Sequence, residues 1–161
     1  MDAANLELLA KYMEWADRRT LAAVRDLPAE VWERSLPASY GSLAGTVEHI
    51  FAAEWTWLER VEGRSPATVG PECGARDRGR LAELWPPVWN GWLQIVARHP
   101  AGDIVCYRTS QGAGYETALG DILLHLSHHS AAYRGQVVAV LRSLGREPAS
   151  TDLIAFLRSR T

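Results

Sequence analysis

Apolar residues recur at intervals of three and four along most of the chain, which is the period of an amphipathic helix. The segments with this pattern cover residues 6–27, 39–63, 78–98 and 119–144, and a short one follows residue 151. Pro28 and Gly63 stand where the first two segments end, and both residue types suit a helix terminus. The pattern therefore predicts four long helices and a short C-terminal helix, an all-α bundle.

The connections carry less information than the helices. Residues 64–77 are rich in Gly, Pro and charge and predict a loop. Pro86 and Pro87 interrupt the third segment, so we expect a kink or a short break there. Residues 101–117 contain an alternating stretch and a Gly-rich tip, which is compatible with an irregular loop or a small hairpin.

Length and charge narrow the classes of function. The 161 residues fit one domain, so we predict a single helical bundle over residues 1–161. A net charge of −2 and the lack of a basic stripe argue against nucleic-acid binding. No apolar run reaches the roughly 20 residues that span a bilayer, and the N-terminus does not resemble a signal peptide. We therefore expect a cytoplasmic protein without membrane contact.

Cysteine and tryptophan usage adds two expectations. Cys73 and Cys106 lie in unrelated settings without CxxC spacing, so neither a disulfide framework nor a thiolate zinc site is predicted. Seven Trp residues are many for this length, and large aromatic side chains gather in cores and at interfaces. This content favours a homodimer.

Histidines on the predicted helices are the main candidates for chemistry. The core stripe of the fourth segment can be traced through Ile122, His125, Leu126, His129, Tyr133, Val137, Val140 and Leu144. His128 falls on the flank of that stripe. In the second segment His49 stands beside the core position Ile50, and antiparallel packing would bring it close to the fourth segment. Facing helices with inward histidines are a recurrent way of building a metal site in a bundle.

Two interpretations of this pattern remain open. Neutral imidazoles suit a divalent metal such as zinc, nickel or iron(II). Alternatively, each histidine is a core residue whose ring nitrogens are satisfied by hydrogen bonds. Other polar residues also have a functional and a structural interpretation. Glu48 and Glu54 are candidates for a general base, but the simpler interpretation is that both are solvated. Arg134 and Gln136 either orient the ligands of the site, or Arg134 is solvated and Gln136 packs against its neighbours.

The order and spacing of these motifs resemble the DinB/YfiT-like family. The likeness rests mainly on two runs, GSLAGTVEHIFAAEWTWLERVEG for the second helix and LGDILLHLSHHSAAYRGQVVAVLRSLG for the fourth. It covers nearly the whole chain and is weakest over residues 64–105. The resemblance implies an up-down-down-up four-helix bundle, often dimeric, that holds a divalent metal with three histidines. One ligand comes from the second helix, and two come from an HxxxH motif before RGQ in the fourth.

The sequence departs from the family at one of these ligands. The first two ligands match His49 and His129, whereas the third position is Tyr133. Tyr133 binds the metal as a phenolate in one interpretation. In a second, His125, one turn before His129, completes a shifted triad. In a third, the metal is lost and Tyr133 hydrogen-bonds a histidine.

The resemblance also implies a range of functions. Family members include metal-dependent transferases and isomerases that use small thiols, so one expectation is a metal-dependent transferase or hydrolase acting on a small molecule or thiol. The alternative is a non-catalytic protein of the same fold that lost its metal site and has a stress-associated binding or dimerisation role. No residue is assigned as a catalytic acid, base or nucleophile.

Overall fold

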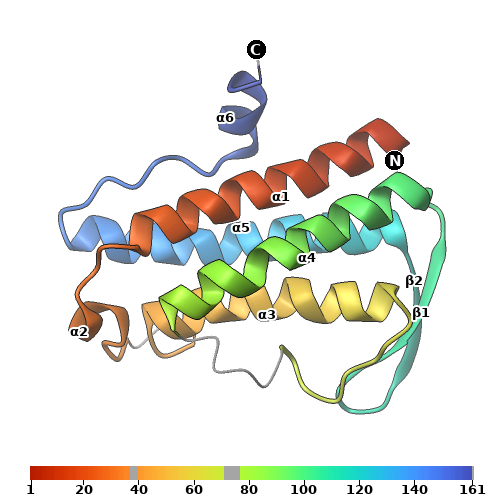
Figure 1. The fold of residues 1–161 in the computed structure, drawn as a ribbon, viewed down its shortest axis with the longest axis horizontal. Coiled ribbons are helices and arrows are strands. Elements are labelled where there is room, and N and C mark those ends of the chain that lie inside the picture. The colour runs from red at the N-terminus through yellow and green to blue at the C-terminus, as the bar shows by residue number, and fades with distance from the viewer. Residues whose placement is uncertain (37–39, 71–76, 161) are drawn as a thin grey trace.

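Four long helices form a bundle, and the all-α prediction is confirmed. The computed structural model describes residues 1–36, 40–70 and 77–160. The long helices are α1 (Ala3–Val24), α3 (Leu43–Val61), α4 (Arg78–Arg98) and α5 (Leu119–Ser143). In Figure 1, α1 and α5 run in one direction and α3 and α4 in the other, so the order is up-down-down-up. Neighbouring pairs around the bundle are α1–α4, α4–α3, α3–α5 and α5–α1.

Side-chain caps begin three of these helices. The side chains of Asp2, Ser42 and Asp77 accept backbone N–H groups from the first turns of α1, α3 and α4. At the other end of α1, the Arg78 guanidinium donates hydrogen bonds to the carbonyl oxygens of Val24 and Leu27, among others. This cation satisfies carbonyls that have no partner within the helix.

Helix α4 continues through Pro86 and Pro87, so the predicted short break is wrong. Each proline lacks an N–H and leaves the carbonyl four residues earlier without its helical partner. These carbonyls belong to Ala82 and Glu83, both exposed, where water can replace the lost bonds. Burial of the apolar face of α4, which contains Trp85 and its neighbours, holds the helix together across the prolines.

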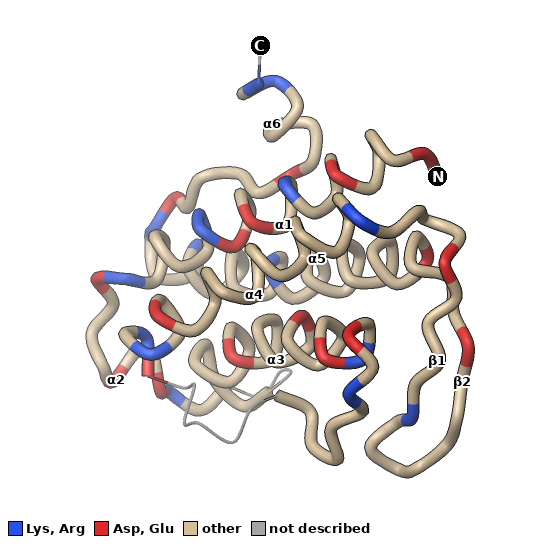
Figure 2. The backbone as a smooth tube through the Cα atoms, turned by 45° about the vertical axis from the view of Figure 1, so that its right-hand side comes forward, with Lys and Arg blue, Asp and Glu red and all other residues tan. Residues whose placement is uncertain are grey.

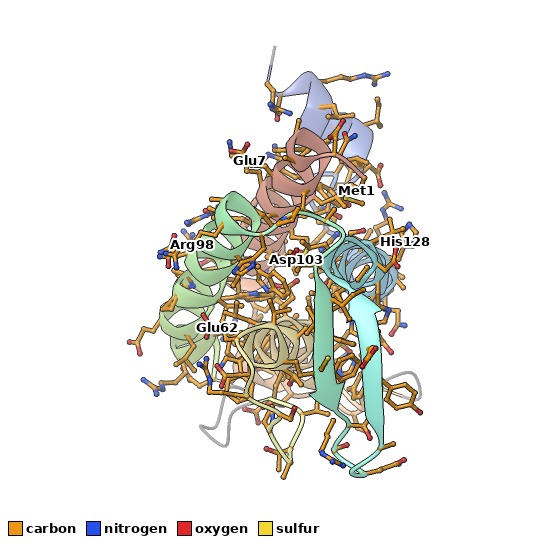
Figure 3. All side chains as sticks on the ribbon, turned by 90° about the vertical axis from the view of Figure 1, so that its right-hand side faces the viewer. Met1, Glu7, Glu62, Arg98, Asp103 and His128 are labelled. Atoms are coloured by element: carbon orange, nitrogen blue, oxygen red, sulfur yellow. The ribbon has the colours of Figure 1, made fainter. Side chains whose placement is uncertain are left out.

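Four short elements complete the fold. Helix α2 (Ala29–Trp32) precedes α3, and helix α6 (Leu153–Arg158) follows α5. Strands β1 (Ile104–Arg108) and β2 (Gly114–Ala118) form an antiparallel hairpin in which Tyr107 faces Tyr115. The hairpin lies against the adjacent ends of α3 and α5 (Figure 3). The short C-terminal helix and the small hairpin therefore agree with the sequence prediction.

Most apolar side chains of the four long helices meet in one core. Trp85 and Trp92 are its largest members, and Trp32 and Trp89 are also buried. A smaller cluster joins α6 to α1, where Phe156 packs against Tyr12 and Trp15. Four of the seven tryptophans thus fill the core of a single chain, while the predicted homodimer stays a prediction.

The surface charges are mixed in sign. Figure 2 shows acidic and basic residues interspersed along the helices. Among the described residues, no helix is both long enough and apolar enough to cross a membrane. Cys106 is a free, exposed thiol on β1, and Cys73 lies outside the described residues.

Candidate metal centre

Two histidines from neighbouring helices meet at the junction of α3 and α5. His49 on α3 and His129 on α5 have their Nε2 atoms 3.0 Å apart. Both side chains are half-buried. Because α3 and α5 are antiparallel and packed together, residues far apart in the sequence come into direct contact. The approach of His49 to the fourth predicted helix is therefore observed.

Two tyrosines surround this pair. The ring centroid of Tyr133, one turn after His129, lies 4.7 Å from the centroid of each histidine ring. Tyr40, which precedes α3, stacks on His49 with centroids 3.7 Å apart and planes inclined by 18°. Sequence reasoning did not select Tyr40, although an aromatic residue two positions before the Ser42 cap is a signal that could have found it. We call Tyr40, His49, His129 and Tyr133 the histidine–tyrosine cluster.

His125 lies at the edge of this arrangement and is exposed. Its ring centroid is 5.7 Å from that of His129 and 5.7 Å from that of Trp57. The predicted core stripe of the fourth helix is thus wrong at His125, and also at Leu144, which is 37% exposed. The buried face of α5 is turned by about one residue from the prediction. It contains Ile122, Leu123, Leu126, Ser130, Arg134, Val137 and Leu141.

The histidine on the flank behaves as the sequence predicts. His128 is exposed, and Figure 3 places it on the side of α5 that faces away from the bundle. His99 forms the C-cap of α4, and its Nδ1 lies 3.0 Å from an Asp103 carboxylate oxygen. Neither residue contacts the histidine–tyrosine cluster, so the candidate centre depends on His49 and His129.

Burial sets the protonation of the cluster. Burial and the neighbouring His129 lower the pKa of His49 to about 4. Burial and then His125 lower the pKa of His129 as well. Burial and a hydrogen bond with Tyr133 raise the pKa of Tyr40 to about 12. Both imidazoles are therefore neutral near pH 7, the form in which histidine binds a metal ion.

The donors of the cluster are few. Within residues 1–36, 40–70 and 77–160, no three or more His, Cys, Asp or Glu side chains are grouped so as to hold a metal ion. Nδ1 of His129 is buried without a hydrogen-bond partner, and so is Oε1 of Gln136. Tyr133 adds a phenol oxygen to this set, since its ring lies beside both histidines.

A group of charged side chains lies in the core behind this cluster. Arg134 is 1% exposed and donates one hydrogen bond to Asp17 Oδ1 at 3.1 Å and another to the Tyr12 hydroxyl at 3.1 Å. Glu54 is fully buried; its carboxylate accepts the Trp85 indole N–H at 2.8 Å and the Ser130 hydroxyl at 2.9 Å. The predictions of a solvated Arg134 and a solvated Glu54 are therefore wrong.

The two buried carboxyl groups affect each other. Burial raises the pKa of Asp17 to about 6, although Arg134 and a hydrogen bond with Glu54 oppose the shift. Burial, and then the charge of Asp17, raise the pKa of Glu54 well above its ordinary value. Of the two carboxyl groups, Glu54 therefore holds its proton to higher pH, and Asp17 is the one whose charge Arg134 neutralises. We call Asp17, Glu54 and Arg134 the buried charge network.

Gly45 sets the position of Tyr40 over His49. A Cβ at position 45 would lie 2.2 Å from the carbonyl oxygen of Tyr40, and the Gly45 N–H donates to the Ser42 cap. We expect Gly45→Ala to lower the free energy of unfolding by about 1–3 kcal/mol and to separate the two rings. Urea unfolding measures the first effect, and the NMR shift of the His49 Cε1 proton measures the loss of stacking.

Gly102→Ala is the matched control for this change. A Cβ at Gly102 meets nothing within 4 Å, so both observables should stay near wild type. If Gly45→Ala behaves like this control, Gly45 does not position Tyr40.

Comparison with known proteins places the whole chain among related sequences. The sequence model of the DinB family matches residues 1–161. Protein DinB of Bacillus subtilis (strain 168) is similar over 157 residues at 18% identity, which covers 92% of this chain and 91% of the relative. Both helices that carry the histidine–tyrosine cluster lie within the family match.

Proposed function

The chain belongs to the DinB family, and from this premise we propose that it is a metal-dependent enzyme whose centre is the histidine–tyrosine cluster. The proposed substrate is a small molecule, and the proposed reaction is a transfer to or from a thiol, or a hydrolysis. His49 and His129 are the proposed metal ligands, with zinc, nickel or iron(II) as the metal.

The separation of the two imidazoles is the observation that carries this proposal. Their Nε2 atoms are 3.0 Å apart. Two nitrogens bound to one tetrahedral zinc at about 2.0–2.1 Å each lie about 3.3 Å from one another. The pair is therefore already near the spacing that a shared cation requires. The lowered pKa of each ring keeps both nitrogens available as neutral donors.

Tyr133 is the third donor that we propose. Its ring lies beside both histidines, and a nearby cation stabilises the phenolate form of a tyrosine. His125 is the weaker candidate because its exposed ring lies between His129 and Trp57 at the edge of the cluster. A site of two histidines and one tyrosine would leave a position for the substrate, as catalytic sites require.

In the proposed enzyme, a bound cation and the tyrosines of the cluster would have separate roles. A bound cation would supply Lewis acidity, which lowers the pKa of a coordinated thiol or water. Tyr40 covers one face of the His49 ring and fixes its orientation. Tyr133 borders the same pair from α5, where loss of its phenol proton would give the cation an oxygen donor.

A second candidate function is favoured by one observation. Nδ1 of His129 is buried without a hydrogen-bond partner among the described residues, whereas a metal-binding histidine usually donates this N–H to an acceptor. The direct contact of His49 with His129 also fits a hydrogen bond between two imidazoles. On this basis the alternative is a non-catalytic protein of the DinB fold, with a binding or dimerisation role.

Metal binding by tag-free protein separates the two candidates. We expect isothermal titration with zinc and with nickel to show one site per chain. We expect His129→Ala to weaken that site by at least about a hundredfold, because a direct ligand matters more than the outer partners whose loss costs about 10–100-fold. Tyr133→Phe should weaken the site as well, since it removes only the phenol oxygen.

His128→Ala is the control for this experiment. It removes an exposed imidazole from the adjacent position of α5 and should leave metal binding unchanged. If the wild-type protein takes up no zinc, nickel or iron, or if His129→Ala binds like the wild type, the metalloenzyme proposal is wrong and the non-catalytic candidate stands.

A further inference from the structure

Arg60, near the C-terminal end of α3, is a buried cation that has no acidic partner among the described residues. Its side chain is only 8% exposed. The guanidinium carbon lies 4.7 Å from the centroid of the Trp57 ring and 5.2 Å from that of Tyr107. No oxygen atom of the described residues hydrogen-bonds this guanidinium, and its Nε is buried without a partner. Among the described residues, the Arg60 guanidinium is therefore held in place without an acceptor for its N–H groups.

The contrast with Arg134 shows why this is unusual. Arg134 is also buried, but it pairs with Asp17 and bonds the Tyr12 hydroxyl. A buried charge is costly without such partners, and arginine is almost never fully buried unless paired. The two rings beside Arg60 offset part of that cost through cation–π attraction. They do not replace an acceptor for its N–H groups.

Two donors of Arg60 remain beside Nε. Nε is the guanidinium nitrogen that is buried without a hydrogen-bond partner among the described residues, and the two terminal nitrogens are not enclosed in this way. Burial lowers the pKa of Arg60 from its ordinary value, and an arginine so shifted is still a cation at neutral pH. Two parallel N–H groups of a fixed guanidinium match the two oxygens of a carboxylate.

Ring contacts connect Arg60 to the histidine–tyrosine cluster. Trp57 lies beside His125, and His125 lies beside His129, with centroids 5.7 Å apart at each step. Trp57 is half-buried and His125 is exposed, so both present ring surface to a ligand. Strand β1 of the hairpin packs against α3 (Figure 3), and the ring of its Tyr107 lies 4.8 Å from the ring of Trp57. Arg60 follows His49 by three helical turns, about 16 Å.

We infer that Arg60 binds the carboxylate of an organic acid whose flat, apolar body lies on Trp57 and His125. The carboxylate receives the terminal N–H groups of Arg60, and the body covers the exposed ring surface. The anion site depends only on Arg60 and the rings beside it. The further step, in which such an acid is the substrate and its far end reaches His49 and His129, rests on the proposed function.

Benzoate is the probe for this site, and its neutral analogue benzamide is the comparison. Isothermal titration at about 0.15 M salt limits long-range charge effects. It is run on the protein as purified and again after treatment with EDTA. We expect wild type to bind benzoate at least about tenfold more tightly than benzamide, because only the carboxylate makes the charge-assisted pair. We expect Arg60→Gln to lose this preference, and Arg60→Lys to keep part of it.

Arg64→Gln is the matched control, because it removes the same charge from an exposed arginine at the same end of α3. Benzoate binding should be unchanged in this variant. Unfolding curves establish that the Arg60 variants are folded, and Arg60→Lys keeps the test valid if Arg60→Gln is not. A role of Arg60 confined to packing the hairpin would alter these curves without giving wild type any preference for benzoate.

Three outcomes would overturn the inference: no benzoate binding by wild type, equal binding of benzamide, or undiminished benzoate binding by Arg60→Gln. The result is independent of the metal proposal. Benzoate binding that survives EDTA and the change His129→Ala supports the anion site even if no metal binds. Zinc binding that survives Arg60→Gln supports the metal site even if the anion site fails.

Discussion

Arg134→Met is expected to lower the free energy of unfolding by about 3–5 kcal/mol, because it leaves the buried carboxylate of Asp17 without its cation. Asp17 and Glu54 are each fully buried, and Arg134 is the guanidinium that bonds Asp17. Methionine fills a similar volume, so the loss reports charge and hydrogen bonding rather than a cavity. Chemical unfolding followed by circular dichroism measures the change.

Two further variants make this result specific. Arg142→Met changes an exposed arginine on the same helix and should alter stability by less than about 0.5 kcal/mol. The double variant Asp17→Leu, Arg134→Met should recover part of the loss, because removing both partners leaves no uncompensated charge between them. A single Arg134→Met variant as stable as wild type would show that the buried pair contributes nothing to stability.

Glu54→Gln is expected to change how stability depends on pH. Burial, and then Asp17, raise the pKa of Glu54 in the folded protein well above its ordinary value of 4.5. The folded protein therefore holds this proton more tightly than the unfolded chain does. The resulting stability is fully present below the unfolded pKa and is lost as pH rises through the folded one, at up to about 1.4 kcal/mol per pH unit.

Glutamine cannot ionise, so the variant should not show this loss. Its amide can still accept the Trp85 N–H, which is the bond that anchors the carboxyl group. We expect wild type to lose stability relative to the variant as pH rises from the ordinary glutamate pKa through the raised pKa of the folded state, and the difference to shrink as pH falls below the ordinary value. Asp17 contributes a slope of the same sign between about pH 4 and pH 6 in both proteins. Parallel stability curves from urea unfolding across this range would contradict the assignment of a proton to Glu54.

The helices were predictable because their apolar residues repeat with the helical period over long stretches. The predicted third segment, residues 78–98, coincides with α4, and the fourth differs from α5 by one residue at its end. The contact of His49 with His129 also followed from the sequence, since antiparallel neighbours bring such positions together. Local periodicity and the packing of adjacent helices were sufficient for these features.

Charged residues in the core were not predictable by the same reasoning. Asp17, Glu54 and Arg134 each occupy a position of the apolar stripe on their helix, and the rule that charge belongs outside assigns them to the surface. Only the fold shows that Arg134 neutralises Asp17 and that Glu54 bonds Trp85 and Ser130. The same rule turned the predicted stripe of the fourth helix towards His125 and away from Ser130.

The aromatic part of the site depends on tertiary structure in another way. Tyr40 lies in a connection without periodicity, and its place over His49 follows from the close approach of its backbone to Gly45. In the sequence, Arg60 cannot be distinguished from an ordinary arginine at a helix end. Its burial and its contact with Tyr107 of the hairpin are visible only in the fold. No pattern within a single segment indicates either contact.

Adjacent residues on α5 point alternately to the histidine–tyrosine cluster and to the bundle core, and this arrangement fixes the geometry of the cluster. His129 and Tyr133 point to the histidine–tyrosine cluster, whereas Ser130 and Arg134, the next residue in each case, bond Glu54 and Asp17 inside the bundle. Apolar packing alone allows neighbouring helices to slide or rotate slightly, but directional bonds to α3 and α1 do not. The alignment of His129 with His49 thus depends on Ser130 and Arg134, whose side chains bond the other two helices.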